Sequence, residues 1–346
     1  MKQLSFLLPF SLTLMLLSAC ITEDLPDNTS PGNFETLWKI LDQRYCFFNE
    51  KQAEYGLNWD SVYTKYRPQV KNNTNSSTLF DICAKMLAEL RDGHVNLTAA
   101  HDIARYWKWF EDYPINRSDS LERIYLGKDY HITCGLKYRR LDNGIGYIRC
   151  SSFENSIGVG NLNEILRDLS TSHALIIDIR GNGGGLVSSA ERLAESFINE
   201  KTLVGYMSHK TGKGHNDFSK AEPIYLSPSK GVRWLKPVAI LTNRECYSAA
   251  NNFVMYMRSL PHVFVVGDRT GGGAGMPFSS ELPNGWSVRF SACPMYDKDM
   301  VCTESGIDPD VKVDITSEDY SQGKDTIIET ALTLLNAMTD KDQEKD

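Results

Sequence analysis

The stretch Ile-Ile-Asp-Ile-Arg-Gly-Asn-Gly-Gly-Gly at residues 176–185 decides the fold, because a buried strand there runs into a glycine loop. Residues 174–180 are nearly continuous in apolar side chains, which is typical of a strand covered on both faces. A helical pattern follows over residues 187–198. Glycine N–H groups at a helix start can bind phosphate or the oxyanion of an acyl-transfer intermediate. A plain tight turn would explain the same residues.

Two phosphate-binding motifs do not fit this loop. The dinucleotide fingerprint requires a third glycine at position 186, where the chain has Leu186. A P-loop requires Gly-Lys-Ser/Thr after the glycines, and no such residues follow. An oxyanion site and an ordinary turn therefore remain as the alternatives for this segment.

A second strand–turn–helix unit places Ser248 between a buried strand at 237–241 and a helical stretch at 249–260. At this position a serine can present its hydroxyl outward, with the Ala249 N–H beside it as a further oxyanion donor. The alternative is a serine that caps the helix. No Gly-x-Ser-x-Gly elbow is present, which argues against the α/β-hydrolase family.

Strands alternate with helices along the second half of the chain, and this order predicts an α/β core. The further segments expected there are strands at 144–150 and 263–267, a helix at 160–169, hairpins over 278–303 and a closing helix at 324–338. The first part of the chain is helical in pattern instead. The expected division is a signal peptide at 1–19, a tether at 20–32, an N-terminal helical domain at 33–98, a connecting segment at 99–140, the core at 141–338 and a polar tail at 339–346.

A serine hydroxyl is a weak nucleophile and needs a positioned base. His94 is the candidate because it follows the end of a helix at 79–90, where Gly93 is expected in the left-handed conformation. Glu304, after the hairpins, could orient the imidazole and stabilise its cation. The simpler alternatives are a solvated histidine in a turn and a solvated glutamate.

The N-terminus predicts export and lipid attachment. Lys2 precedes an apolar run that ends in Leu-Ser-Ala-Cys at 17–20, which is similar to a bacterial lipobox. Lipidation of Cys20 would anchor the protein to a membrane of the bacterial cell envelope. An ordinary signal peptide with a chance cysteine is the alternative.

Composition excludes some functions and leaves others open. A formal net charge of −7 without a basic patch argues against nucleic-acid binding. No spacing typical of metal ligands, such as Cys-x-x-Cys, is present. Of the eight cysteines, seven remain after Cys20, an odd number that cannot pair completely. Cys293 and Cys302 lie symmetrically in an expected hairpin, and we treat a disulfide between them as a hypothesis.

Several segments together resemble the C-terminal processing (tail-specific) peptidases. They occur in the family's order, from about residue 33 to 338, and they are Arg-Asp-Gly-His-Val (91–95), the glycine-loop stretch (176–185), Ser-Ala-Ala (248–250), Val-Gly-Asp-Arg-Thr-Gly-Gly (266–272) and Gly-Ile-Asp-Pro-Asp-Val (306–311). The Asp-Gly-His segment is similar to the branch that contains the tricorn protease and the interphotoreceptor retinoid-binding protein.

The branch determines the base that the resemblance implies. Tail-specific peptidases use a Ser–Lys dyad, but Gly273 stands at the place of that lysine. The tricorn-like branch uses His and Glu, which correspond to His94 and Glu304. In tricorn a serine precedes the histidine and relays to the glutamate, whereas this chain has Gly93. Glu304 would then reach His94 through water or another hydroxyl, or would orient it more loosely.

The resemblance implies a crotonase/ClpP-like superhelical α/β core behind a small helical domain that supplies His94. It implies a serine endopeptidase for unfolded or C-terminal protein segments, with Ser248 as nucleophile, Gly184 or Gly183 together with Ala249 as oxyanion donors, and no cofactor. Residues 99–140 are too few for the PDZ module of many relatives, so none is expected. One alternative is a catalytically inactive peptide- or ligand-binding lipoprotein on the same scaffold. The other is acyl-CoA chemistry, which an exported location disfavours.

Overall fold

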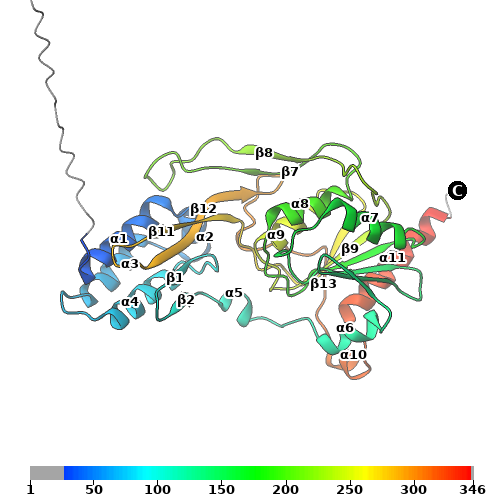
Figure 1. The fold of residues 1–346 in the computed structure, drawn as a ribbon, viewed down its shortest axis with the longest axis horizontal. Helices are drawn as coiled ribbons and strands as arrows, with labels where there is room; N and C mark the ends of the chain where they lie inside the picture. Colours follow the sequence, from blue (N-terminus) through cyan, green and yellow to red (C-terminus); the bar gives the residue numbers. More distant parts are fainter. Residues whose placement is uncertain (1–26, 344–346) are drawn as a thin grey trace, which may run out of the picture.

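The computed structural model describes residues 27–343 and, in its last helix, side chains only as far as residue 338. The predicted signal peptide, the lipid-modified Cys20 and most of the tether lie outside the described residues, as does the end of the polar tail. Within 27–343, no helix is both long and apolar enough to cross a membrane. Figure 1 shows an N-terminal lobe of helices at one end of the molecule and a sheet-containing core at the other.

The N-terminal lobe consists mainly of helices. They are α1 (Ser30–Arg44), α2 (Phe48–Tyr55), α3 (Trp59–Tyr66), the 3-10 turn η1 (Arg67–Gln69) and α4 (Ser76–Ala88). The Asn75 side chain accepts the Thr78 N–H at 2.8 Å and so caps α4. After α4 the left-handed residue is Arg91, with φ 47°, and not Gly93 as predicted. Position 93 therefore needs a glycine for lack of space for a side chain, and not because of its backbone conformation.

The core is built on a seven-stranded sheet with the order β13-β10-β9-β6-β5-β4-β3. Its strands are β3 (His131–Thr133), β4 (Leu136–Arg140), β5 (Gly146–Arg149), β6 (Leu175–Asp178), β9 (Val238–Thr242), β10 (Val263–Gly267) and β13 (Val311–Lys312). The strands from β5 to β13 run parallel, and β3 and β4 are antiparallel additions at one edge. The carboxyl ends of β6 and β9 are neighbours, so the two loops that carry the predicted chemistry meet.

Helices cover both faces of this sheet, which confirms the predicted α/β class. The core helices are α7 (Val159–Asp168), α8 (Val187–Glu195), α9 (Ala249–Met257), α10 (Ser317–Ser321) and α11 (Thr326–Gln343). Ile176 belongs to the apolar cluster beneath α11, whereas Leu175 and Ile177 belong to the cluster on the other face with α7, α8 and α9. This alternation follows from the two-residue period of a strand.

A second sheet connects the lobe to the core. It has the order β2-β1-β12-β7-β8, and β11 also pairs with β12. Its strands are β1 (Asn96–Thr98), β2 (Ile103–Arg105), β7 (Thr202–Met207), β8 (Glu222–Leu226), β11 (Gly275–Glu281) and β12 (Ser287–Tyr296). Because β12 pairs with β1 in the lobe and with β7 beyond it, this one strand spans both parts. The predicted domain boundaries stay a prediction.

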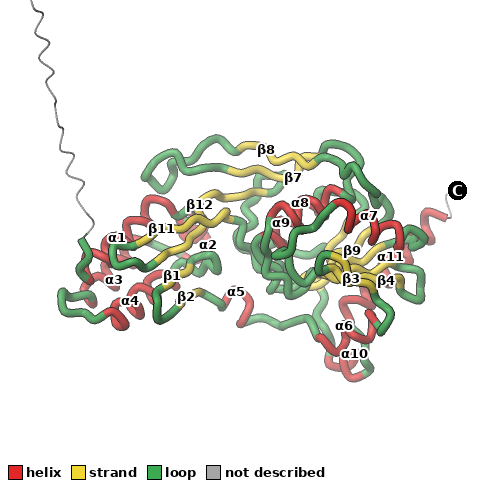
Figure 2. The backbone as a smooth tube through the Cα atoms, viewed as in Figure 1, coloured by secondary structure: helices red, strands yellow, loops and turns green. Residues whose placement is uncertain are grey.

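Residues 106–118 cross between the two parts mostly as loop, interrupted by α5 (Lys108–Glu111) and followed by α6 (Asp119–Leu126) (Figure 2). The segment 99–140 thus contributes short helices and edge strands, and no PDZ module is present in the described part of the chain.

The predicted disulfide is wrong, because Cys293 and Cys302 are both free. Cys302 pairs across the turn with Tyr296, and the Asp297 N–H donates to the Val301 carbonyl at 2.9 Å. The hairpin register is therefore offset from the symmetric one that the sequence suggested. Cys293 Sγ instead lies 3.5 Å from His209 Nδ1.

Candidate active site

The Asp-x-Arg part of the glycine-loop stretch is a buried brace. Arg180 donates to both carboxylate oxygens of Asp178, at 3.0 and 2.6 Å, and to both of Asp325, at 3.0 and 2.9 Å. The pKa of Asp178 falls to about 2 because the Arg180 and Arg149 guanidiniums outweigh its burial, which acts in the opposite direction. The brace ties the end of β6 to the start of α11, and it fixes the position from which the glycine loop departs.

Asn182 gives the loop its shape. Its side-chain nitrogen donates to the Cys150 carbonyl at 3.1 Å, and its side-chain oxygen accepts the Gly184 N–H at 2.9 Å. The predicted donor Gly184 therefore already has a partner inside the protein. Among the described residues, no hydrogen bond engages the N–H groups of Gly183 or Ala249. These two donors remain available to a ligand.

Gly184 must be a glycine because the glycine loop passes directly over the turn that carries Ser248. Its φ is +100°, and a Cβ there would lie 2.8 Å from Ser248 Cβ and 3.0 Å from the Ala249 nitrogen. Real side chains do not tolerate such contacts. The close approach brings the glycine loop, which includes the free Gly183 N–H, next to the Ala249 N–H beside Ser248. Two backbone donors near the serine are what an oxyanion site requires.

Ser248 does not cap the helix that follows it. Its side chain makes no capping hydrogen bond, and its backbone has φ 57° and ψ −122°. Positive φ is uncommon for a non-glycine residue, and such strain concentrates at functional sites. The Ser248 N–H donates to the Gly272 carbonyl at 2.9 Å, which holds the turn in this conformation. The hydroxyl is thereby directed away from the helix.

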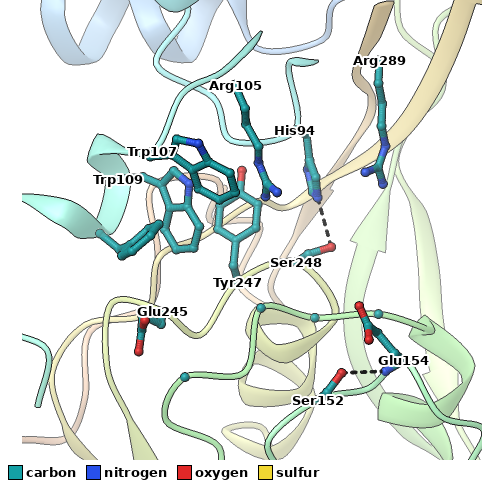
Figure 3. A pocket seen from close by; sticks show the side chains of 15 residues that line it. His94, Arg105, Trp107, Trp109, Ser152, Glu154, Glu245, Tyr247, Ser248 and Arg289 are labelled. Atoms are coloured by element: carbon teal, nitrogen blue, oxygen red, sulfur yellow. Dashed lines mark hydrogen bonds between the residues drawn. The ribbon is translucent and has the colours of Figure 1, made fainter. Parts of the chain in front are cut away.

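His94 and Ser248 meet, as predicted. His94 Nε2 lies 3.0 Å from Ser248 Oγ, although 154 positions separate the two residues (Figure 3). The imidazole is 3% exposed, and its Nδ1 has no hydrogen-bond partner among the described residues. Burial, and to a smaller extent Arg289 and Arg105, lower the pKa of His94 to about 4, against the opposing effect of Asp92. At neutral pH the imidazole is therefore uncharged and able to accept a proton.

Tyr247 explains why both Gly93 and Gly273 are glycines. A Cβ on Gly93 would lie 2.6 Å from Trp109 Nε1 and 3.0 Å from the Tyr247 hydroxyl, and a Cβ on Gly273 would lie 2.5 Å from the Tyr247 ring. Trp109 stacks on Tyr247 with ring centroids 4.1 Å apart. The space that a serine at 93 or a lysine at 273 would use is occupied by this aromatic pair.

Asp92, which sequence reasoning did not single out, connects the base to the nucleophile turn. Its Oδ1 accepts the His94 backbone N–H at 2.7 Å and the Tyr247 hydroxyl at 3.2 Å, and its Oδ2 accepts the Ser291 hydroxyl at 2.8 Å. The carboxylate is 1% exposed. Its place two residues before the candidate base was the only signal in the sequence.

Glu304 is buried, but no hydrogen bond joins it to His94 in the described structure. Its Oε2 accepts the Ala274 N–H at 2.9 Å, and its Oε1 lies 3.4 Å from the Lys51 ammonium. Burial and the neighbouring Asp92 raise the pKa of Glu304, although Lys51 opposes them. No sequence pattern indicates Lys51, since one lysine in a polar helix is not distinctive.

The Ser248 hydroxyl opens into a cleft of about 450 Å³. Arg105 and Arg289 lie on the His94 side of this cleft, and Glu154 lies on the side of the glycine loop (Figure 3). Within residues 27–343, no group of three or more His, Cys, Asp or Glu side chains is arranged to hold a metal ion. The chemistry that the cleft offers is a nucleophile, a neutral base and backbone donors.

Comparison with known proteins finds similarity to peptidases. Residues 144–313 match peptidase family S41, and residues 26–88 match the tricorn protease C1 domain. A solved structure from Parabacteroides merdae ATCC 43184, described as a candidate peptidase, is 52% identical. It covers 89% of this chain and 97% of its own, with a TM-score of 0.85.

Two curated relatives match more distantly. The tricorn protease of Thermoplasma acidophilum is 29% identical over 57% of this chain, and the carboxy-terminal processing protease CtpA of Bacillus subtilis is 27% identical over 52%. These matches cover 17% and 37% of the two relatives, so the chain spans well under half of their length.

Proposed function

The chain belongs to peptidase family S41, and we propose from this premise that it is a serine peptidase with Ser248 as nucleophile and His94 as general base. The observation that carries the proposal is the 3.0 Å contact between His94 Nε2 and Ser248 Oγ at the strained turn before α9. A nucleophile and a base within hydrogen-bond reach are the requirement for such catalysis.

In the proposed reaction His94 removes the Ser248 proton as the hydroxyl attacks a peptide carbonyl. The N–H groups of Ala249 and Gly183 then donate to the developing oxyanion, because both lack a partner within the described residues. The Gly184 N–H donates to Asn182 and holds the loop, so we assign it a supporting part.

The second half of the reaction runs through the same base. His94 gives its proton to the leaving amine, and a water molecule then attacks the acyl group on Ser248 to regenerate the enzyme. Asp92, which raises the pKa of His94, stabilises the imidazolium that forms between the two steps. By resemblance to its relatives, the proposed substrate is an unfolded or C-terminal protein segment.

Ser248→Ala tests the assignment. We expect peptide hydrolysis to fall by roughly 10⁴-fold or more, because the covalent route is lost. A fluorophosphonate probe should label the wild type and fail to label the variant, while circular dichroism shows an unchanged fold. Ser120→Ala, at an exposed serine outside the cleft, is the matched control.

An unlabelled wild type that still binds peptides would favour the alternative of a catalytically inactive binding lipoprotein. Turnover retained by Ser248→Ala would remove Ser248 from the reaction altogether.

We also propose that the mature protein is held in the bacterial cell envelope by lipid on Cys20, on the strength of the Leu-Ser-Ala-Cys stretch. Mass spectrometry of the N-terminal peptide should show a diacylglyceryl cysteine, and Cys20→Ala should abolish it. An unmodified cysteine, or cleavage at another position, would contradict this location.

A further inference from the structure

Two arginines lie on either side of His94, above Ser248 in Figure 3. In the second sheet Asn96 of β1 pairs with Arg105 of β2 on one side and with Arg289 of β12 on the other. Residues directly opposite one another in a sheet project from the same face. Arg105 and Arg289 therefore flank the turn that carries His94, and both line the cleft into which Ser248 opens (Figure 3).

Neither guanidinium is neutralised by the protein. Within residues 27–343 no ion pair joins Arg105 or Arg289 to a carboxylate, whereas most arginines of the core are paired in this way. Arg105 Nε donates to the Gly93 carbonyl at 2.8 Å, and its guanidinium lies 4.1 Å from the Trp107 ring centroid. These contacts hold the Arg105 side chain in place without cancelling its charge.

The glycine-loop side of the cleft carries negative charge. Glu154 lies beside the glycine loop. Glu245 lies in the loop before Ser248, and Arg117 is 3.9 Å from its carboxylate. A peptide in this cleft therefore meets positive charge near His94 and negative charge near the glycine loop. A substrate with an anionic group would place it on the arginine side.

The proposed reaction identifies which part of the substrate lies there. His94 delivers its proton to the leaving amine, so the leaving fragment must begin next to the imidazole. Arg105 and Arg289 flank this imidazole, and an anion that they bind must belong to the leaving fragment. Since an extended residue spans roughly 3.3–3.6 Å, the anion lies within about two residues of the cleaved bond.

We propose that Arg105 and Arg289 form a carboxylate-binding site for the leaving fragment, which makes the enzyme selective for peptides with an acidic group just after the cleaved bond. The inference rests on the proposed function and names a substrate class for it. The carboxylate is supplied either by the C-terminus of the peptide or by an Asp or Glu side chain. Guanidinium forks suit both, because they bind carboxylates through paired hydrogen bonds.

Substrate binding at this site would also affect the base. Arg289 and Arg105 lower the pKa of His94. A carboxylate between them offsets their charge, so the imidazole becomes a better proton acceptor once the preferred substrate is bound. Selectivity would therefore appear in kcat as well as in KM.

The experiment compares three otherwise identical peptides that end two residues after the cleaved bond. The first ends in a free carboxylate and the second in an amide. The third also ends in an amide, but its last residue is glutamate. We expect the wild type to cleave the free acid or the glutamate peptide about 10- to 100-fold faster, in kcat/KM, than the plain amide. Which of the two is faster identifies the source of the carboxylate.

Arg289→Gln and Arg105→Gln should each reduce this preference, and the double variant should bring the ratio close to one. Arg140→Gln, at an exposed arginine at the end of β4, is the matched control and should keep the ratio. Arg289 is the more informative position, because its side chain is exposed and its replacement leaves no buried group unpaired.

Binding separates this inference from the proposed function. Calorimetry with the Ser248→Ala variant should rank the affinities of the three peptides in the same order as their cleavage rates. Adding Arg105→Gln and Arg289→Gln to that variant should make the three affinities similar. Equal cleavage of all three peptides by the wild type would overturn the carboxylate site and leave the peptidase intact. Carboxylate-dependent binding without any hydrolysis by the wild type would overturn the peptidase and leave the site intact.

Discussion

Asp92 and Glu304 are neighbouring buried carboxylates, yet the protein holds them in different ways. Asp92 accepts hydrogen bonds from the His94 backbone, the Tyr247 hydroxyl and the Ser291 hydroxyl. These donors come from the turn that carries His94, the turn that carries Ser248, and β12. In the described structure no salt bridge joins Asp92 to a cation, and all of its hydrogen bonds come from neutral donors.

Glu304 faces a cation instead. It lies against the buried ammonium of Lys51 and accepts the Ala274 N–H. Of the two carboxylates, Asp92 shifts the pKa of His94, and Glu304 is not among the groups that do so. The comparison teaches that a carboxylate matched by family resemblance can lie apart from the histidine, while a carboxylate that the resemblance did not single out lies beside it.

The largest expected effect follows from Asp92→Asn. The change keeps the size and one of the two acceptor oxygens but removes the charge that stabilises the His94 cation, so we expect kcat to fall by about 10²-fold, at the low end of general acid–base contributions. Steady-state kinetics with a fluorogenic peptide would measure it. A merely structural role would lower the amount of folded protein without changing kcat per labelled active site.

Gly93→Ser should come next. The change introduces the residue that precedes the histidine in tricorn, but its Cβ would lie 2.6 Å from Trp109 Nε1. The Trp109–Tyr247 pair must move, and with it the hydrogen bond from Tyr247 to Asp92, so we expect kcat to fall roughly 10-fold, about the effect of one lost hydrogen bond to a charged group. Increased activity would show that a serine relay to Glu304 can still form and that the aromatic pair is dispensable.

Glu304→Gln should change kcat by only a few-fold, because glutamine can still accept the Ala274 N–H. It leaves the Lys51 ammonium buried without its counter-ion, so we expect a loss of about 3 kcal/mol in the free energy of unfolding. Urea denaturation and kinetics on the same samples separate the two effects. A kcat loss as large as that of Asp92→Asn would show that Glu304 orients His94, as the resemblance implied.

The smallest effect is the pH dependence of the wild type. The pKa of His94 is lowered to about 4, and the neutral imidazole is the active form above that value. We therefore expect kcat/KM to rise with pH through about 4 and to stay within about two-fold of its neutral value at pH 5.

In Asp92→Asn the acid limb of this profile should move to lower pH, because Asp92 raises the pKa of His94. In Glu304→Gln it should stay in place. A wild-type limb near pH 6.5 would show that His94 is less buried than described.

The α/β class was predicted from local patterns, whereas the meeting of His94 with Ser248 was predicted from the resemblance to a known family, because each residue alone also suited a simpler role. Long apolar strands, a glycine loop and a serine between strand and helix each have a recognisable signature, and β9 and β10 begin within one residue of their predicted start.

Contacts between distant segments could not be predicted in the same way. Lys51 against Glu304 and Arg105 beside Arg289 depend on packing and strand register, which single residues do not encode. The reason for a glycine was also hard to predict from the sequence. Gly93 was explained by backbone conformation, but the structure requires it because Tyr247 and Trp109 fill the space beside it.

The position of β12 has a consequence for the time at which activity can arise. This strand forms only when residues 287–296 exist, and it is the strand that brings β1, next to His94, into the same sheet as β7 of the core. In a growing polypeptide His94 and Ser248 therefore both exist before the strand that joins their two parts of the molecule. A chain that ended before residue 287 would lack this strand, so we expect the proposed site to assemble only when the chain is nearly whole.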